Sequence, residues 1–176
     1  ANQSFMLTVD PVNDAPYILA QLPNTSIGED ATEEIVSNLY NYFADVDDTI
    51  LTFTPVSNEP NVVVTTNGTN LEAIVANATD NFSGPVTITV TATDLQGATV
   101  EQNFTLDVTE ENDAPTVIAT LPGANIPEDS TGNILVSDLN AYFDDIEDVT
   151  LSFTAYPTTG PISIDVSTDA LVVGST

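Results

Sequence analysis

The sequence predicts an all-β protein built from tandem β-sandwich repeats. The first observation is a block of residues that recurs after roughly 100 positions, as expected for a repeated domain. The second is a strict alternation of apolar residues with threonine, most clearly over residues 86–92. A period of two is typical of a half-buried strand. Turn residues separate the strand-like segments, which favours a sandwich of short strands over a helical repeat.

The repeat rests on residue matches that occur in the same order in both blocks. The junction Asn13-Asp14-Ala15-Pro16 returns as Asn112-Asp113-Ala114-Pro115. One residue is inserted before the later matches, and the order is otherwise kept. The remaining matches pair Phe5, Leu7 and Val9 with Phe104, Leu106 and Val108, Leu22-Pro23 with Leu121-Pro122, Glu29-Asp30 with Glu128-Asp129, Tyr42-Phe43 with Tyr142-Phe143, and Leu51-x-Phe53 with Leu151-x-Phe153.

These matches set the expected domain boundaries. Residues 1–10 match the end of a repeat, so they are expected to be the last strand of a preceding repeat. Residues 11–112 are expected to form one complete repeat. Residues 113–176 are expected to form a truncated second repeat that lacks its last hairpin, because no later residues match the stretch from Asp80 to Val108.

Two elements are expected in the first half of the complete repeat. Tyr17 and Ile18 follow the Ala-Pro dipeptide and predict a first strand. Leu39, Tyr42 and Phe43 have helical spacing, but the segment is too short for more than a turn or two of helix. The repeated pair Tyr42-Phe43 is expected to pack in the core rather than to stack on a carbohydrate.

The second half predicts most of the sandwich. Leu51 and Phe53 mark one strand, and residues 86–108 predict a hairpin. About seven short strands in one repeat favour an immunoglobulin-like Greek-key β-sandwich. The chain has no Cys and no Trp, so the Cys…Trp…Cys pattern of a true immunoglobulin domain is absent. The expected turns are Asn67-Gly68, between strands at Val62–Val64 and Leu71–Ala76, and Leu95-Gln96-Gly97 inside the hairpin.

The charge composition excludes several classes of function. The chain contains 27 Asp and Glu residues but no Lys, Arg or His, which gives a formal net charge of −27. Nothing can neutralise phosphates, so nucleic acid is excluded as a partner and anionic lipid surfaces are disfavoured. No apolar run approaches the roughly 20 residues of a membrane-spanning helix, so no membrane insertion is expected. Without His, Cys, Lys or Arg, the usual catalytic bases, nucleophiles and oxyanion clamps are missing, and an enzyme is not expected.

The same composition makes bound cations attractive. No carboxylate can form a salt bridge with a side chain of this chain, so the like charges only repel. Salt can screen this repulsion, and a bound cation can neutralise the densest clusters. Clustered oxygen ligands without nitrogen or sulfur suit calcium rather than zinc or copper.

Four acidic features stand at the expected ends of elements. Most single carboxylates are expected to be solvated loop residues. Their combination is more specific, since Asp-x-Asp on an extended backbone presents two carboxylates in one direction. An Asn-Asp shortly before Pro also favours an extended linker. The four features are Glu29-Asp30, Asp45-x-Asp47-Asp48, Ala92-x-Asp94-x-x-Gly97 and Glu111-Asn112-Asp113.

On these residues the chain resembles the cadherin-like tandem repeats of bacterial extracellular surface proteins and adhesins. The Asn-Asp-Ala-Pro junction, Asp45-x-Asp47 and Ala92-x-Asp94 carry the resemblance. It implies calcium ions between consecutive repeats, with ligands from the upstream repeat, the linker and the downstream repeat. The implied ligands are Glu29, Asn112, Asp113, Asp145 and Glu147 at one junction, with Glu111 and Asp80 as further candidates, and Asn13, Asp14, Asp45, Asp47 and Asp94 at the preceding one.

Three departures from the family pattern bear on these ligands. Asp145-Ile146-Glu147 replaces the expected Asp-x-Asp, and Glu reaches further than Asp. The second repeat has no counterpart of Asp94, and the first junction has no upstream Glu.

The expected function is a non-enzymatic, calcium-stiffened stalk repeat of a large surface or filament protein, located outside the cell. Its expected partners are neighbouring repeats of the same protein. The alternatives are a module that binds a glycan or a cell-surface protein, and a filament subunit completed by strand addition from a neighbouring chain.

Overall fold

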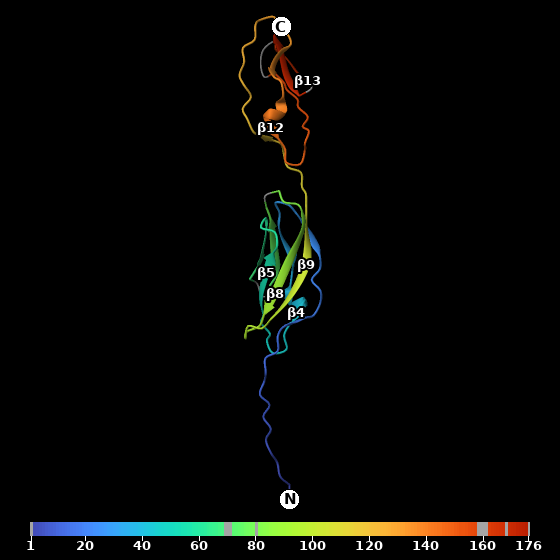
Figure 1. Ribbon diagram of the computed structural model, residues 1–176, viewed down its shortest axis with the longest axis vertical. Helices are drawn as coiled ribbons and strands as arrows, with labels where there is room; N and C mark the ends of the chain where they lie inside the picture. The colour runs from blue at the N-terminus through green and yellow to red at the C-terminus, as the bar shows by residue number, and fades with distance from the viewer. Residues whose placement is uncertain (1, 69–71, 80, 158–161, 168, 176) are drawn as a thin grey trace. The chain divides into compact units, whose positions relative to one another are not determined.

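The chain divides into two compact units. The computed structural model describes residues 2–68, 72–79, 81–157, 162–167 and 169–175 (Figure 1). Unit 1 is Ala1–Glu111 and unit 2 is Asn112–Thr176.

Unit 1 is a sandwich of a four-stranded and a three-stranded sheet (Figure 1). The larger sheet has the order β2-β9-β8-β5 and the smaller one β3-β7-β6, while β1 and β4 form a short separate pair. Fold class and approximate strand number were thus predicted correctly. The bounds are β1 Tyr17–Ile18, β2 Thr25–Gly28, β3 Thr32–Val36, β4 Phe43–Ala44, β5 Thr52–Ser57, β6 Val62–Thr66, β7 Ile74–Ala78, β8 Gly84–Thr93 and β9 Thr99–Thr109.

The alternation in β8 and β9 builds the centre of the core. Every second residue of β8 from Val86 to Ala92 is buried, and the threonines between them face away from the core. Leu106 of β9 is fully buried on the same face. Burying a side chain of this size stabilises the fold by about 1.5–3 kcal/mol, so this hairpin is a large contributor to stability.

A short 3-10 helix, η1 (Leu39–Asn41), lies where helical spacing was predicted. Asn38 caps it by accepting a hydrogen bond from the backbone N–H of Tyr40. Tyr40 packs edge-on against Phe53, with ring centroids 5.3 Å apart. Phe43 is fully buried, and Tyr42 packs against the core, so the core role predicted for this aromatic pair is confirmed.

The predicted turns lie close to their expected positions. Asn67 and Ala73 are joined by two hydrogen bonds, and Gly68 has a positive φ of 62° that favours glycine. The following strand begins at Ile74; Leu71, its expected start, lies outside the described residues. At the β8–β9 turn, Gly97 has a φ of 91° and donates its N–H to the Asp94 carbonyl.

Unit 2 reproduces one part of this architecture. β10 pairs with β12 as β1 pairs with β4, and the sheet β11-β14-β13 corresponds to β3-β7-β6. The segment around Leu151 and Phe153 forms no strand, because its unit 1 counterpart β5 pairs with β8 and the described part of unit 2 has no such partner. The bounds are β10 Thr116–Val117, β11 Asn133–Val136, η2 Leu139–Ala141, β12 Phe143–Asp144, β13 Ile162–Ser167 and β14 Ala170–Ser175.

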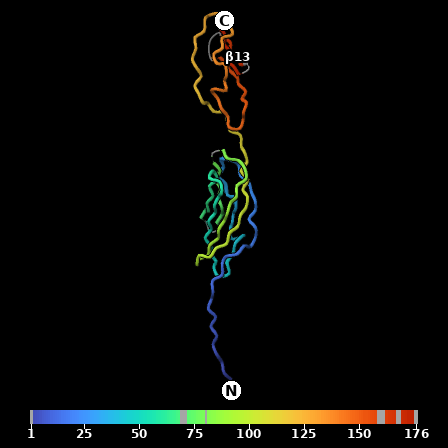
Figure 2. The backbone as a smooth tube through the Cα atoms, in the orientation of Figure 1, coloured from blue at the N-terminus to red at the C-terminus, as the bar shows by residue number. Residues whose placement is uncertain are grey.

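That residues 1–10 are the last strand of a preceding repeat stays a prediction, because the described chain contains no such repeat to pair with them. Residues 2–10 run as a segment without any strand pairing in the described chain (Figure 2). A strand needs a neighbour for its hydrogen bonds, and the described residues offer this segment none. Its apolar residues Phe5, Leu7 and Val9 are 89%, 76% and 82% exposed.

The buried side-chain amide of Gln102 links residues 20–22 to β9. Gln102 is 6% exposed, and its Oε1 accepts a hydrogen bond from the backbone N–H of Leu22. Its Nε2 donates to the Ala20 carbonyl at 3.1 Å. The side chain therefore replaces the backbone pairing that a strand over residues 20–22 would make with β9.

Replacing Gln102 by alanine is expected to destabilise unit 1 by about 1–3 kcal/mol, because the Leu22 N–H loses its buried hydrogen-bond partner. Asn103→Ala is the matched control, since Asn103 is the next residue of β9 and is exposed. Urea unfolding of both variants measures the difference. Equal small losses would show that the amide makes no special contribution.

Candidate metal centre

Six polar residues gather at one end of unit 1 and are called here the entry cluster. They come from three places in the chain: the segment before β1, the segment after β4, and the turn between β8 and β9. The members are Asn13, Asp14, Asp45, Asp47, Asp48 and Asp94. Five of them were predicted ligands.

Asp45 organises the loop that follows β4. Its Oδ1 accepts hydrogen bonds from the backbone N–H groups of Asp47 at 2.8 Å and Asp48 at 2.9 Å. Such a turn is typical of aspartate. Its Oδ2 is buried and has no hydrogen-bond partner among the described residues. Buried polar atoms normally have a partner, so this oxygen calls for an explanation.

The other carboxylates of this loop connect it to the neighbouring segments. Asp47 Oδ2 accepts a hydrogen bond from the backbone N–H of Asp14 at 2.8 Å. Asp48 Oδ2 accepts one from the backbone N–H of Leu95 at 3.1 Å. Sequence reasoning did not select Asp48 as a site residue. Its only signal was its place next to the Asp-x-Asp pair.

Asp94 is the most fully satisfied carboxylate of the cluster and is 6% exposed. Its Oδ2 accepts a hydrogen bond from Asn13 Nδ2 at 2.8 Å. Its Oδ1 accepts from the backbone N–H groups of Gln96 at 2.9 Å and Ala98 at 2.7 Å. The Asn13 bond, followed by the backbone bonds, lowers the pKa of Asp94, while desolvation acts in the opposite direction.

A pocket of about 260 Å³ lies beside the entry cluster. Asp45 and Asp48 line one part of it. Tyr40, Phe43 and Leu51 line another, so the pocket combines carboxylates with apolar walls.

Unit 2 carries a second set of predicted ligands with the same local pattern. Asp145 Oδ1 accepts from the backbone N–H of Glu147 at 3.1 Å and of Asp148 at 2.9 Å. Glu147 Oε2 accepts from the backbone N–H of Asp113 at 3.1 Å, as Asp47 does from Asp14 in unit 1. Glutamate therefore fills the structural position of the aspartate. Asn112 donates to the Asp113 carbonyl at 2.6 Å.

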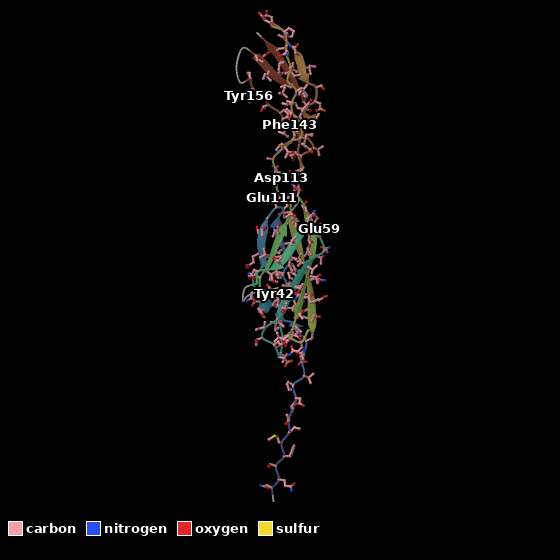
Figure 3. All side chains as sticks on the ribbon, turned by 90° about the vertical axis from the view of Figure 1, so that its left-hand side faces the viewer. Tyr42, Glu59, Glu111, Asp113, Phe143 and Tyr156 are labelled. Carbon is pink, nitrogen blue, oxygen red and sulfur yellow. The ribbon has the colours of Figure 1, made fainter. Side chains whose placement is uncertain are left out.

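Glu29 lies at the other end of unit 1 and is 5% exposed. It accepts a hydrogen bond from the backbone N–H of Glu111 at 2.8 Å and donates its own N–H to the Thr109 carbonyl at 2.9 Å. The Glu111 side chain lies against Gly28, where an added Cβ would be 3.3 Å from it. Glu111 ends unit 1, and Asp113 lies near the start of unit 2 (Figure 3).

The predicted ligands are thus brought together only in part. Asn13, Asp14, Asp45, Asp47 and Asp94 share one end of unit 1, and Asn112, Asp113, Asp145 and Glu147 are linked within unit 2. Glu29 belongs to unit 1, and Asp80 lies outside the described residues. Within the described ranges, no group of three or more Asp, Glu, His or Cys side chains is arranged to hold a metal ion.

Membrane-crossing helices are also absent from the described part of the chain: none of its helices has the length and apolar character to span a bilayer.

Comparison with known proteins identifies the family of unit 1. The model of the bacterial Ig domain matches residues 13–107, more than half of the chain. This match supports the immunoglobulin-like sandwich; the narrower cadherin-like type and its Asn-Asp-Ala-Pro junction stay predictions. No curated protein matches the sequence.

Two solved structures are similar to the chain at low identity. An endo-fucoidan hydrolase of glycoside hydrolase family 107 is 15% identical, with a TM-score of 0.49. The match covers 96% of this chain and 25% of the hydrolase chain, so the present chain spans a quarter of that enzyme's length. A chimeric titin is 12% identical, with a TM-score of 0.38 over 94% of this chain and 83% of that one. Both similarities are too weak to indicate a function for this chain.

Asn13→Ala is expected to raise the pKa of Asp94 toward its ordinary value of about 3.9. Folding lowers this pKa, so the ionised carboxyl stabilises unit 1 above the unfolded pKa, and the stabilisation is lost as the pH falls through the lower folded pKa. The variant should therefore lose stability near neutral pH and little in strong acid. NMR titration of Asp94 and thermal unfolding across pH in EDTA measure both effects, with Asn2→Ala as control. A loss that is the same at every pH would contradict the assignment.

Proposed function

Because the chain belongs to the bacterial Ig domain family, we propose that it is a non-enzymatic repeat of a large extracellular or cell-surface protein, and that calcium stiffens it at its acidic ends. The family supports the coarser part of this proposal, since Ig-like sandwiches recur in cell-surface proteins as structural modules. The calcium part is carried by the entry cluster.

The calcium proposal rests on one observation, which concerns the Oδ2 atom of Asp45. This oxygen is buried and has no hydrogen-bond donor among the described residues, in a chain that has no Lys, Arg or His. A buried carboxylate oxygen without a donor or a cation is costly. A calcium ion would provide the missing charge, since it takes six to eight oxygen ligands at about 2.3–2.6 Å.

The remaining ligands would have to include more than carboxylates. No three acidic side chains of the described residues are arranged as a metal site, and several carboxylates hold backbone N–H groups. Calcium accepts amide and backbone carbonyl oxygens and water as readily as carboxylates. Asn13 and the carbonyls of the loop after β4 could supply such oxygens within the entry cluster. The proposal therefore includes a local rearrangement on binding.

The biological role follows from repetition of this pattern. Unit 2 holds Asp113, Asp145 and Glu147 with the same backbone bonds that unit 1 uses for Asp14, Asp45 and Asp47. Calcium at such positions would neutralise the carboxylates and fix the segments that lead into each unit. The chain would then serve as a stalk whose partners are neighbouring repeats, with a glycan or a cell-surface protein as the target of the whole protein.

Calcium is expected to raise the melting temperature of the chain, and Asp45→Asn is expected to remove most of this rise. The asparagine keeps the Oδ1 acceptor of the turn and removes the negative charge. A site occupied at 100 times its dissociation constant would add about 2.7 kcal/mol to stability. Calorimetry at fixed high ionic strength, with and without millimolar calcium, measures the effect.

Asp107→Asn is the matched control, because Asp107 carries the same charge on the exposed face of β9. Simple screening acts on all carboxylates and would leave both variants with the same response to calcium. Equal rises in the two variants, or none in the parent chain, would refute the entry site. Magnesium at the same concentration tests selectivity, since it requires a stricter octahedral geometry.

A further inference from the structure

The two main sheets of unit 1 have four edge strands in the described chain. The larger sheet, β2-β9-β8-β5, is bounded by β2 and β5, and the smaller sheet, β3-β7-β6, is bounded by β3 and β6. An edge strand presents unpaired N–H and C=O groups and can pair with a strand of another molecule. Proteins usually prevent such pairing with proline, charged side chains, β-bulges or very short edge strands.

Three of these edges carry such protection. β5 contains Pro55, which has no N–H to offer on the open side of the ladder. β3 contains Glu33 and Glu34, and its register is interrupted by an irregularity after Glu34. β2 is only four residues long. Pairing with another molecule is therefore disfavoured at β2, β3 and β5.

The fourth edge, β6, has none of these protective features. Its sequence is Val-Val-Val-Thr-Thr, so it contains no proline, no charge and only β-branched residues, which favour strands. Its pairing with β7 is regular over all five residues. The nearest acidic residues in the sequence are Glu59 and Glu72, so residues 60–71 are uncharged in a chain of net charge −27. β6 is therefore the unprotected edge of unit 1.

The hydrogen-bond pattern shows which backbone groups of β6 are open. Asn61 and Asn67 bond through their backbone to the chain around β7, at the two ends of the ladder. Every second residue of an antiparallel pair bonds to the neighbouring strand, so the odd-numbered residues face β7. Val62, Val64 and Thr66 turn their N–H and C=O groups to the open side. The Val62 N–H bonds within the preceding turn, and the other groups have no strand partner among the described residues.

We propose that β6 of one copy pairs with β6 of a second copy in antiparallel orientation, so that two three-stranded sheets join edge to edge. The two-fold axis passes through Val64, the middle residue of the strand, which gives each of the five residues a residue opposite. Val64 lies opposite Val64 of the second copy, and Val62 lies opposite Thr66. This interaction needs no calcium and does not rest on the proposed stalk function.

This register uses the open backbone groups and covers apolar surface. The two Val64 residues exchange a pair of N–H···O=C hydrogen bonds, and each Thr66 N–H donates to the Val62 carbonyl of the other copy. Val63, which is 56% exposed, comes to lie opposite Thr65 of the other copy. Side chains that lie directly opposite each other stabilise an antiparallel sheet.

Charge favours β6 itself as the occupant of this edge. Because the chain has no cationic side chain, an acidic strand would gain no ion pair here and would be repelled by Glu59 and Glu72. The occupant must be an uncharged, β-branched strand with open backbone groups. Among the edge strands of unit 1, β6 combines these properties.

The corresponding edge of unit 2 is protected by charge. Its sheet β11-β14-β13 is bounded by β13, which corresponds to β6. β13 carries the exposed Asp165, opposite Val172, where β6 carries Thr65 opposite Val75. An acidic side chain on an edge strand opposes pairing with another acidic chain. The proposed contact is therefore specific to unit 1.

The contact predicts a closed dimer. It joins the same surface of both copies, so it is isologous and leaves no free β6 edge for a third copy. It is smaller than a standard interface, so a dissociation constant between about 1 μM and 1 mM is expected. High monovalent salt should strengthen the dimer, because it screens the repulsion between two chains of net charge −27.

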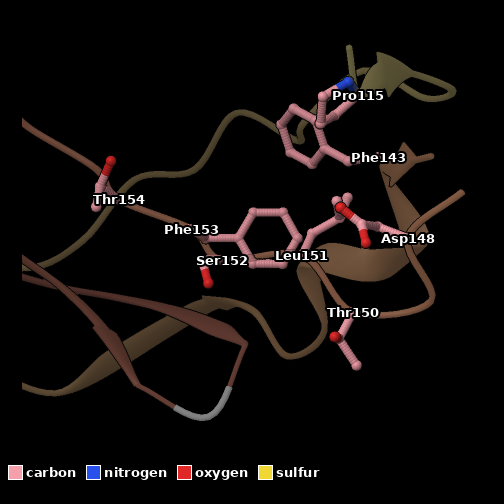
Figure 4. Close-up of a pocket in the computed structure, with 8 residues that line it drawn as sticks. All are labelled: Pro115, Phe143, Asp148, Thr150, Leu151, Ser152, Phe153 and Thr154. Carbon is pink, nitrogen blue, oxygen red and sulfur yellow. The ribbon is translucent and has the colours of Figure 1, made fainter. Parts of the chain in front are cut away.

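Unit 2 offers a competing route to association. Phe143, Leu151 and Phe153 are only half-buried and line a pocket of about 530 Å³ (Figure 4). The rings of Phe143 and Phe153 are 5.5 Å apart at this pocket. A dimer formed through the pocket would not depend on the sequence of β6, so substitutions in β6 separate the two routes.

Sedimentation velocity of the 176-residue chain tests the proposal between about 10 μM and 1 mM, in EDTA and high monovalent salt. The parent is expected to show a monomer–dimer equilibrium. Val63→Asp is expected to raise the dissociation constant by about tenfold or more, because it places two negative charges about 7–8 Å apart across the axis. The fold should persist, as β13 forms with the exposed Asp165, and thermal unfolding checks this.

Val56→Asp is the matched control for this variant. Val56 is also 56% exposed and also lies on an edge strand of unit 1, but on β5, which Pro55 protects. The substitution adds the same charge to the same unit. This variant should therefore dimerise like the parent.

A single introduced cysteine tests the register, and the absence of native Cys leaves no background. Val64→Cys places both thiols at the axis, where opposite Cα atoms about 5.5 Å apart are within the range that a disulfide spans. Thr66→Cys is the control, because its two thiols would lie four residues apart along the paired strands, about 13 Å. Mild oxidation should give disulfide-linked dimers of Val64→Cys and far fewer of Thr66→Cys.

Five outcomes would each overturn the proposal. They are a parent that stays monomeric at about 1 mM, assembly that continues beyond the dimer, an equal loss of dimer in Val56→Asp and Val63→Asp, equal cross-linking of the two cysteine variants, and an unchanged dissociation constant in Val63→Asp. The last outcome would assign the association to the unit 2 pocket instead of β6.

Discussion

The structure depends on how carboxylates are accommodated in a chain without a single cationic side chain. Three of them, Glu29, Asp45 and Asp94, are buried wholly or in part, and each accepts hydrogen bonds from backbone N–H groups. These donors lie in turns and loops next to the strands, so the backbone supplies the partial positive charge that Lys or Arg provides elsewhere. All three carboxylates directly follow the end of a strand, where unpaired N–H groups are available.

The parts of the fold that were predictable are those with local patterns. The alternation in β8 and β9 identifies both strands, and Asn67-Gly68 identifies a turn, because neighbouring residues carry the signal. β2 and β3 were not predicted. β2 is held by parallel pairing to residues 106–109 at the far end of the repeat, and β3 begins with Thr32-Glu33-Glu34, which has no apolar alternation. Their strand conformation is imposed by pairing partners that lie far away in the sequence, so no local pattern predicts it.

The candidate site was predictable to the same extent. Asp-x-Asp spacing selected Asp45 and Asp47, and the turn motif selected Asp94. The contacts that unite them, from Asn13 to Asp94 and from Leu95 to Asp48, join segments that only the folded sandwich brings together. Which oxygen of Asp45 lacks a donor also depends on the packed loop. The residue types therefore predicted the chemistry of the candidate site. Tertiary contacts determine which hydrogen bonds each of its side chains makes.

The parallel pairing of β2 with β9 has a mechanical consequence. Both strands run in the same direction, so a force that reaches β2 from its N-terminal side and β9 from its C-terminal side acts at opposite ends of the pair. Tension along the chain pulls these strands past each other, and their hydrogen bonds share the load instead of opening one after another. Glu29 extends this shear joint through its bonds to Thr109 and Glu111. The β2–β9 pair is therefore arranged to be loaded in shear when unit 1 is stretched.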